Sequence, residues 1–116
     1  MGSRLEAIRA QQLSDANTPW FYEVQRYVVG GGNTYLPDFW VVEGASMGDV
    51  LGLLGNTPTM PDILRFLAST QYRVEDVKGW WRPDHPSYSK VESFRYSFPN
   101  IQFQVVVKDK DGWSCQ

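Results

Sequence analysis

Two short stretches of the chain combine carboxylates, aromatic residues and a lysine in a pattern suited to chemistry on a phosphate. Asp38 lies in the first stretch, residues 35–42, and both Asp76 and Lys78 lie in the second, residues 72–79. Aromatic and β-branched residues dominate both stretches, so each is predicted to be a strand. Because side chains alternate between the two faces of a strand, Asp76 and Lys78 should share one face. Two carboxylates and an ammonium group from two strands could hold a divalent cation beside a phosphate.

The reaction that fits this set is hydrolysis of a phosphodiester. It requires a more acidic attacking water, neutralisation of charge on the phosphate and help for the leaving oxygen. Mg²⁺ or Mn²⁺ supplies these when carboxylates hold it and leave positions open, so we predict Asp38 and Asp76 as ligands, with the carbonyl of Val77 as a third. Lys78 would position the water or stabilise developing charge. Glu6, in a predicted helix, is the best candidate for a further acid, and no organic cofactor is expected.

Each of these residues also has an ordinary structural role open to it. Glu6 stands three residues after Ser3, which is the spacing of a capping box. Asp38 follows a proline and could lie in a turn rather than a strand. Asp76 and Lys78 could form a simple ion pair. The sequence alone leaves these alternatives open.

Three residues close to the candidate site are predicted to lie outside it. Glu75 should point to the opposite face of its strand from Asp76 and is predicted to be a surface residue. His85 stands in a proline-rich loop and is predicted to be solvated rather than a ligand or base. Glu23 could be an acid that supports the site, although surface exposure is the simpler prediction.

A loop of aromatic and basic residues follows Lys78 and supplies candidates for contacts with nucleic acid. Trp80 could stack on a base, and one of Trp80 and Trp81 is predicted to close the core. Arg82 and Lys90 are the basic candidates. The formal net charge of −2 and the pI near 5.3 argue against a protein that coats nucleic acid. They do not exclude a nuclease, because bound metal ions reverse the local charge of an acidic site.

The elements that must position these residues follow one another as helices and strands. The patterns predict a helix at 3–13, a strand at 20–29 that forms a hairpin with the Asp38 strand, two helices within 43–71, a helix that Ser87 caps and residues 99–100 end, a buried strand at 101–107 and a polar tail at 108–116. This order predicts an α/β fold with one mixed sheet. The helical insertion at about 43–71 could cover the site, contact substrate, pair two subunits or serve only packing.

Composition limits the class of protein. The 116 residues, 42% of them hydrophobic, predict a single domain, residues 1–116, with a sizeable core. The single cysteine, Cys115, excludes an internal disulfide and suits a reducing compartment. No apolar run approaches the roughly 20 residues of a membrane span, and no signal peptide is recognised. We therefore expect a cytoplasmic protein without a membrane partner.

These residues resemble the motif of the PD-(D/E)xK nuclease superfamily. Pro37-Asp38 matches its first half, and Asp76-Val77-Lys78, followed by glycine, matches its second. The likeness extends further, to phage endonuclease I-type Holliday-junction resolvases, in four stretches: residues 3–7, 21–23, 35–39, and 76–80 with the helix that ends at 98–100. The resemblance covers about three quarters of the chain, all but the insertion and the tail.

The resemblance implies a restriction-endonuclease-like core, a mixed sheet flanked by helices with a helical insertion between the two motif strands. It implies that Glu6, Asp38 and Asp76 bind metal and that Lys78 is catalytic. The expected protein is a Mg²⁺-dependent endodeoxyribonuclease that acts on duplex or branched DNA, as a homodimer, in a bacterial or phage-infected cell. The alternative is a non-catalytic DNA-binding or assembly module on a nuclease fold.

Two features depart from these resolvases. Their two motif strands are usually joined by a short turn, whereas residues 43–71 intervene here. The sequence also ends soon after the last predicted core strand, without the further C-terminal segment that such resolvases carry. The first departure concerns the geometry of the substrate, and the second concerns junction resolution and an intertwined dimer.

Overall fold

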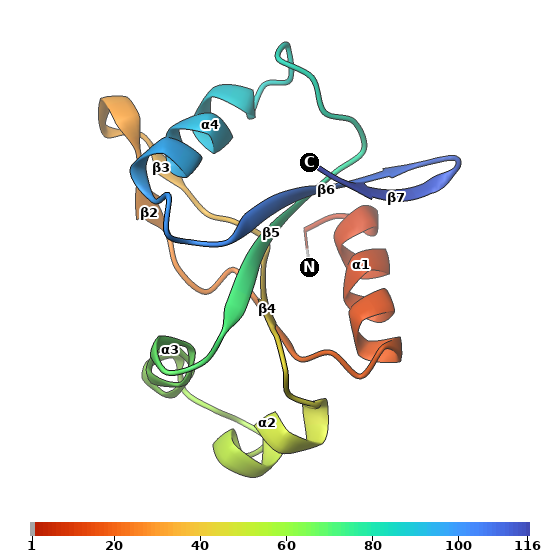
Figure 1. Ribbon diagram of the computed structural model, residues 1–116, viewed down its shortest axis with the longest axis vertical. Coiled ribbons are helices and arrows are strands. Elements are labelled where there is room, and N and C mark those ends of the chain that lie inside the picture. The colour runs from red at the N-terminus through yellow and green to blue at the C-terminus, as the bar shows by residue number, and fades with distance from the viewer. Residues whose placement is uncertain (1) are drawn as a thin grey trace.

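A five-stranded mixed sheet forms the centre of the computed structural model, which describes residues 2–116 (Figure 1). Its spatial order is β1-β4-β5-β6-β7, with β1 at Trp20–Tyr22, β4 at Phe39–Val42, β5 at Tyr72–Lys78, β6 at Phe103–Asp109 and β7 at Gly112–Cys115. Only β5 and β6 are parallel; the other neighbours are antiparallel. The predicted α/β fold with one mixed sheet is confirmed.

Helices cover both faces of this sheet. Helix α1, Arg4–Asp15, packs on one face, and α4, Tyr88–Ser97, packs on the other and connects the parallel strands β5 and β6 (Figure 1). A small ribbon formed by β2, Tyr27–Val28, and β3, Thr34–Tyr35, joins α4 on its face, with a short 3₁₀ turn at Gly30–Gly32 between the two strands. Alternation along β4 divides the apolar side chains between the faces, because Phe39 and Val41 pack beneath α1 whereas Trp40 and Val42 join the larger core around α4.

The predicted hairpin of two long strands is instead broken into two short pieces. Glu23 has a φ of +49°, a left-handed conformation that cannot continue a strand, and it separates β1 from β2. On the partner side, residues 36–38 separate β3 from β4, and Pro37 has no N–H to donate to a sheet. Asp38 therefore lies in a bend directly before β4, as the turn alternative proposed, and not within a strand.

The insertion between β4 and β5 consists of two helices, as predicted. Helix α2, Met47–Leu54, and helix α3, Met60–Ala68, each begin with a capping box, in which the side chain at the N-cap and the acid three residues later bond reciprocally to backbone N–H groups. The insertion starts after Val42 and ends before Tyr72, and these two residues pair across the strands. It therefore occupies the end of β4 and β5 away from Asp38 and Lys78 (Figure 1).

The C-terminal region differs from the predicted polar tail. It forms β7, which pairs with β6 through a turn in which Gly112 has a φ of +124°. Ser87 precedes α4 but makes no capping hydrogen bond with its side chain, contrary to the prediction. Within residues 2–116, none of the helices has the length and apolar character that crossing a bilayer requires.

Candidate functional site

The antiparallel pairing of β4 and β5 brings the two aspartates together. Phe39 pairs with Glu75, so the register continued by one residue places Asp38 opposite Asp76. Asp38 extends from its bend toward β5, and its Oδ2 accepts a hydrogen bond of 2.8 Å from the backbone N–H of Val77. The two halves of the predicted site therefore meet where β4 begins and β5 ends.

The two carboxyl groups face each other in a region with little solvent. Asp76 is 2% exposed. Burial, and then the hydrogen bond with Asp76 and its charge, raise the pKa of Asp38 to about 9, although the Val77 N–H acts in the opposite direction. Two anionic carboxylates are therefore unfavourable here, and a proton or a cation between them would remove the repulsion.

Asp76 is held by two donors that reach the same oxygen. The Tyr35 hydroxyl donates to Oδ2 at 2.5 Å, and the Lys78 ammonium lies 3.2 Å from it. The predicted common face of Asp76 and Lys78 is confirmed, and the ion pair that was the alternative is present. Because the Lys78 side chain keeps 19% of its surface exposed, a ligand could still reach the ammonium group.

Glu6 lies on α1 and makes only half of a capping box. Its N–H donates to the Ser3 side chain, but its own carboxylate accepts a hydrogen bond of 2.5 Å from the Tyr22 hydroxyl. Its charge also contributes to the raised pKa of Asp38. Among residues 2–116, no group of three or more His, Cys, Asp or Glu side chains is arranged to hold a metal ion. The structure thus joins Asp38 with Asp76, and leaves Glu6 outside a three-acid cluster.

The carbonyl of Val77 faces the same side as Asp38. In an extended strand the N–H and the carbonyl of one residue point to the same edge, and the N–H of Val77 points at the Asp38 carboxylate. The last residue pair between β4 and β5 at this end is Phe39 with Glu75. The Val77 carbonyl therefore lies beyond the paired part of the two strands. Val77 as a metal ligand remains a prediction.

Glu75 is not the surface residue that was predicted. It is fully buried, and Arg9 on α1 donates to both of its oxygens at 2.8 Å. Arg73 and Gln104 each add a hydrogen bond of 2.9 Å. Burial would raise the pKa of Glu75, but the hydrogen bonds and charges of the two arginines lower it overall. The prediction was wrong because α1 covers this face of the sheet. The only nearby residue in the sequence that indicated a paired Glu75 was Arg73, two positions away.

His85 is also less exposed than predicted. It is half-buried, with its ring 4.5 Å from the Trp80 ring and 5.2 Å from the Trp81 ring between centroids. Burial and the charge of Lys78 lower its pKa, so the ring is neutral at pH 7. Its Nδ1 accepts a hydrogen bond from the backbone N–H of Ser87. The histidine therefore stabilises the loop after β5.

The candidates for nucleic-acid contacts lie at the surface, in the loop after Lys78 and at the start of α4. Trp80 is 42% exposed, and the Arg82 guanidinium lies 5.0 Å from the centre of its ring. Lys90 is exposed in the first turn of α4. Trp81 packs against the larger core, which confirms that one of the two tryptophans closes it. The structure brings Trp80 and Arg82 together, while Lys90 lies on a separate element.

Two tyrosines that the sequence did not single out complete the surroundings of the acids. Tyr35 is bonded to Asp76 and Tyr22 to Glu6, across separations of 41 and 16 residues. Burial raises the pKa of both hydroxyls well above the usual tyrosine range, so both remain protonated donors. No local spacing signals such contacts, because they arise from the packing of separate elements.

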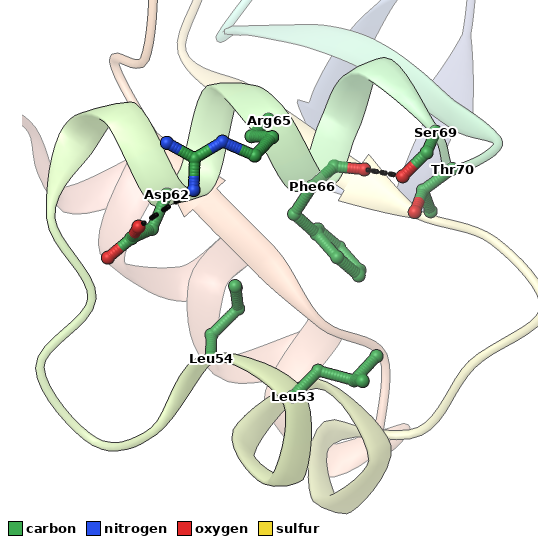
Figure 2. Close-up of a pocket in the computed structure, with 7 residues that line it drawn as sticks. All are labelled: Leu53, Leu54, Asp62, Arg65, Phe66, Ser69 and Thr70. Carbon is green, nitrogen blue, oxygen red and sulfur yellow. Dashed lines mark hydrogen bonds and ion pairs between the residues drawn. The ribbon is translucent and has the colours of Figure 1, made fainter.

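An open groove of about 590 Å³ lies between α2 and α3 (Figure 2). Leu53, Leu54 and Phe66 form its apolar part, and the ion pair of Asp62 and Arg65 lies at its rim. None of the predicted site residues lines it. Because it belongs to the insertion, at the far end of β4 and β5, it takes no part in the chemistry considered for Asp38 and Asp76.

Comparison with known proteins assigns no family. No protein-family model matches the sequence, and no curated protein or solved structure matches it. The arrangement of side chains around Asp38 and Asp76 is therefore the observation from which a function is inferred.

Proposed function

We propose that this protein is a metal-dependent DNA endonuclease of the PD-(D/E)xK type, which hydrolyses phosphodiester bonds with Mg²⁺ or Mn²⁺. One observation carries the proposal: two carboxyl groups, Asp38 and Asp76, face each other at one end of neighbouring strands, with the Lys78 ammonium 3.2 Å from the second. The same end of a sheet thus offers oxygen ligands for a hard cation and a positive charge for a phosphate.

The residues present fit a divalent cation. The raised pKa of Asp38 shows that two negative charges are unfavourable at this place without a positive partner. Asp38 and Asp76 would hold the ion, with the Val77 carbonyl as the further oxygen of the proposed set. When bound, Mg²⁺ or Mn²⁺ would make an attacking water more acidic and reduce the negative charge on the phosphate.

The other charged groups have separate tasks in this proposal. Lys78 would contact a phosphate oxygen and stabilise the charge that develops there, since its side chain is partly open to solvent. Glu6 would contribute from the side of α1, where the Tyr22 hydroxyl fixes its carboxylate. Glu6 would then act on the site through an intervening water molecule and not as a direct metal ligand, because it does not join the two aspartates in one cluster.

The architecture supports a restriction-endonuclease-like core. The two strands next to the aspartates, β4 and β5, are neighbours inside a mixed sheet, and α1 and α4 flank the two faces (Figure 1). The insertion lengthens the connection between these strands but leaves them paired from Phe39 to Val42. The departure from a short turn therefore does not disturb the proposed site.

The proposed substrate is duplex or branched DNA. Trp80 and Arg82 stand in the loop that begins directly after Lys78, so they would contact the DNA next to the scissile phosphate. Lys90 would contact a phosphate farther along the backbone. Structure-selective cleavage like that of a junction resolvase belongs to the same proposal, with the four-way junction as its test substrate.

Cleavage assays with defined DNAs test the proposal. Purified protein with Mg²⁺ or Mn²⁺ is incubated with labelled duplex, nicked, flap and four-way-junction DNA. We expect cleavage that EDTA abolishes, and a loss of at least about 100-fold for Asp38→Asn, Asp76→Asn and Lys78→Ala, since the first two each remove a proposed metal ligand and the third removes the charge proposed to contact the phosphate. The control Asp15→Asn changes an exposed carboxylate at the end of α1 and should cleave like the wild type.

A non-catalytic DNA-binding module is the second candidate, favoured by the absence of a three-acid cluster among residues 2–116. Calorimetric titration with Mg²⁺ and Mn²⁺ separates the two. Binding of metal to the wild type, lost in Asp38→Asn and Asp76→Asn, supports the nuclease. DNA binding without metal binding and without cleavage of any substrate would replace it with the binding module.

A further inference from the structure

We propose that Tyr35 is a positioning residue that fixes the orientation of the Asp76 carboxylate for metal binding. This role rests on the proposed function of the site. The observation that carries it is a hydrogen bond of 2.5 Å from the Tyr35 hydroxyl to Oδ2 of Asp76, the same oxygen that the Lys78 ammonium approaches at 3.2 Å.

Two donors on one oxygen restrict the carboxylate. The length of the tyrosine contact is typical of a hydroxyl bonded to a charged oxygen, which is among the stronger hydrogen bonds in proteins. Rotation of the Asp76 carboxylate would break this bond and lengthen the ion pair with Lys78. The orientation that the acid presents to Asp38 is therefore set before any ligand arrives.

The hydroxyl of Tyr35 is itself held firmly. Tyr35 is 6% exposed, and its ring packs against Phe94 on α4 and Phe103 on β6, with ring centroids 5.4 and 6.3 Å apart. Its backbone pairs with Tyr27 in the small ribbon β2–β3. A donor mounted on a packed core moves little, which is the requirement for orienting a ligand to within a fraction of an ångström.

The chain offers a matched control in Tyr27. This tyrosine is 8% exposed, belongs to the same aromatic cluster and packs against Phe94 and Phe98. No hydrogen bond joins its hydroxyl to Asp76. Tyr35→Phe and Tyr27→Phe each remove one oxygen and keep the ring, so both preserve the packing of the core, and only the first removes a donor from the proposed ligand.

The experiment measures metal binding and cleavage for the wild type and both variants. We expect Tyr35→Phe to weaken Mn²⁺ and Mg²⁺ binding in calorimetry by about 10- to 100-fold, the usual effect of removing a partner that orients a metal ligand. Cleavage by Tyr35→Phe should be lost at limiting metal and return when Mn²⁺ is raised by the same factor. Tyr27→Phe should match the wild type in both measurements.

A second measurement uses the unaltered protein. The buried Tyr35 hydroxyl proton, identified by its contacts with ring protons in NMR spectra, should shift when Mg²⁺ is added, while the signals of Tyr27 should not. Equal metal affinity and equal metal dependence of cleavage in Tyr35→Phe and Tyr27→Phe would overturn the role of Tyr35 alone. A wild type that binds no metal and cuts no DNA would overturn the proposed function, and the role of Tyr35 with it.

Discussion

Asp38 and Asp76 hold their carboxyl groups against each other, which costs stability in the absence of a cation. The Asp76 side chain is buried, and desolvation together with the neighbouring Asp76 carboxyl group disfavours the ionised form of Asp38. Lys78 offsets only part of this, because its ammonium contacts Asp76 alone. Such a conflict between charge and burial is typical of a site that is shaped for a ligand rather than for stability.

Asp38→Asn should stabilise the metal-free protein. With a pKa near 9 when folded and one near 3.9 when unfolded, Asp38 binds a proton more tightly in the folded state. Its contribution is therefore most favourable below pH 4 and is lost as the pH rises toward 9. Asparagine does not ionise, so the variant should gain about 0.5–2 kcal/mol over the wild type at pH 8.

Chemical denaturation in EDTA at several pH values measures this gain. The advantage of Asp38→Asn should shrink steadily as the pH is lowered from 8 to 4. Added Mg²⁺ should then stabilise the wild type more than the variant, because only the wild type retains both carboxylates. If the stability gained by Asp38→Asn did not change with pH, ionisation of Asp38 beside Asp76 would not be its cause.

The first helix is fastened to the central strand by a buried ion pair on the opposite face of the sheet from Lys78. Arg9 is 9% exposed, and it bonds to both oxygens of the fully buried Glu75. The same guanidinium lies 5.5 Å from the centre of the Trp113 ring on β7. One arginine thus links α1, β5 and β7, and it fixes the helix that carries Glu6.

Glu75→Gln should destabilise the protein by about 3–5 kcal/mol at pH 7, because it leaves the Arg9 charge buried and unpaired. Its pH dependence is opposite to that of Asp38: the arginines lower the pKa of Glu75, so its contribution is complete above about pH 4.5 and is lost as the pH falls through the lowered value. Denaturation curves at pH 7 and pH 4 measure both effects. The partly exposed pair of Glu92 and Arg95 provides the control, since Glu92→Gln should change stability by less than about 1 kcal/mol.

The insertion is attached at the opposite end of β4 and β5 from the acids. Its two ends already form a hairpin, since the Glu43 N–H donates to the carbonyl of Gln71 at 3.0 Å. A turn of Asn-Gly in place of residues 44–70 would close this hairpin with suitable geometry. The site therefore does not depend on the insertion for its geometry.

Replacing residues 44–70 by Asn-Gly should leave the metal affinity and the cleavage of short duplexes unchanged. Stability should fall by about 3–6 kcal/mol, because the change removes Val50 and Leu67, both buried in the larger core. A milder variant, Leu53→Ser, alters an exposed side chain at the groove and should retain both properties. Loss of cleavage in the milder variant, with the fold intact by circular dichroism, would show that the insertion contacts the substrate.

At the scale of the whole molecule, one chain carries one pair of facing aspartates. Cleavage of both strands of a duplex or a junction usually takes two such sites, so we propose that the active species is a homodimer. The surface charge is mixed, with a net charge of −2, and the basic residues after β5 must therefore supply much of the attraction to DNA.

Mixing the wild type with an excess of Asp76→Asn tests the dimer on supercoiled plasmid. Mixed dimers have one working site, so nicked circles should accumulate in place of linear product, while the wild type alone should yield linear DNA. The control is an equal excess of Asp15→Asn, which keeps its site and should not alter the ratio. A ratio of linear to nicked product that is unaffected by Asp76→Asn would show that single chains act independently.

Local sequence patterns were sufficient for the helices of the insertion and for the strands on either side of it. Ser46 with Asp49 and Thr59 with Asp62 carry their capping signals within four residues, so no distant contact is needed to place α2 and α3. Alternation along β5 likewise placed Asp76 with Lys78, because the period of a strand depends only on its backbone.

The sequence by itself determined the properties that depend on neighbouring residues. These are the starts of helices, the assignment of β5 side chains to the two faces of the sheet, and the types of side chain available to a cation and a phosphate. Only the tertiary structure decided that Asp38 lies in a bend opposite Asp76, that Glu75 is buried against Arg9, and that Tyr35 bonds to Asp76. These contacts span 38, 66 and 41 residues. They form only when separate elements pack together and exclude water, which no local pattern encodes.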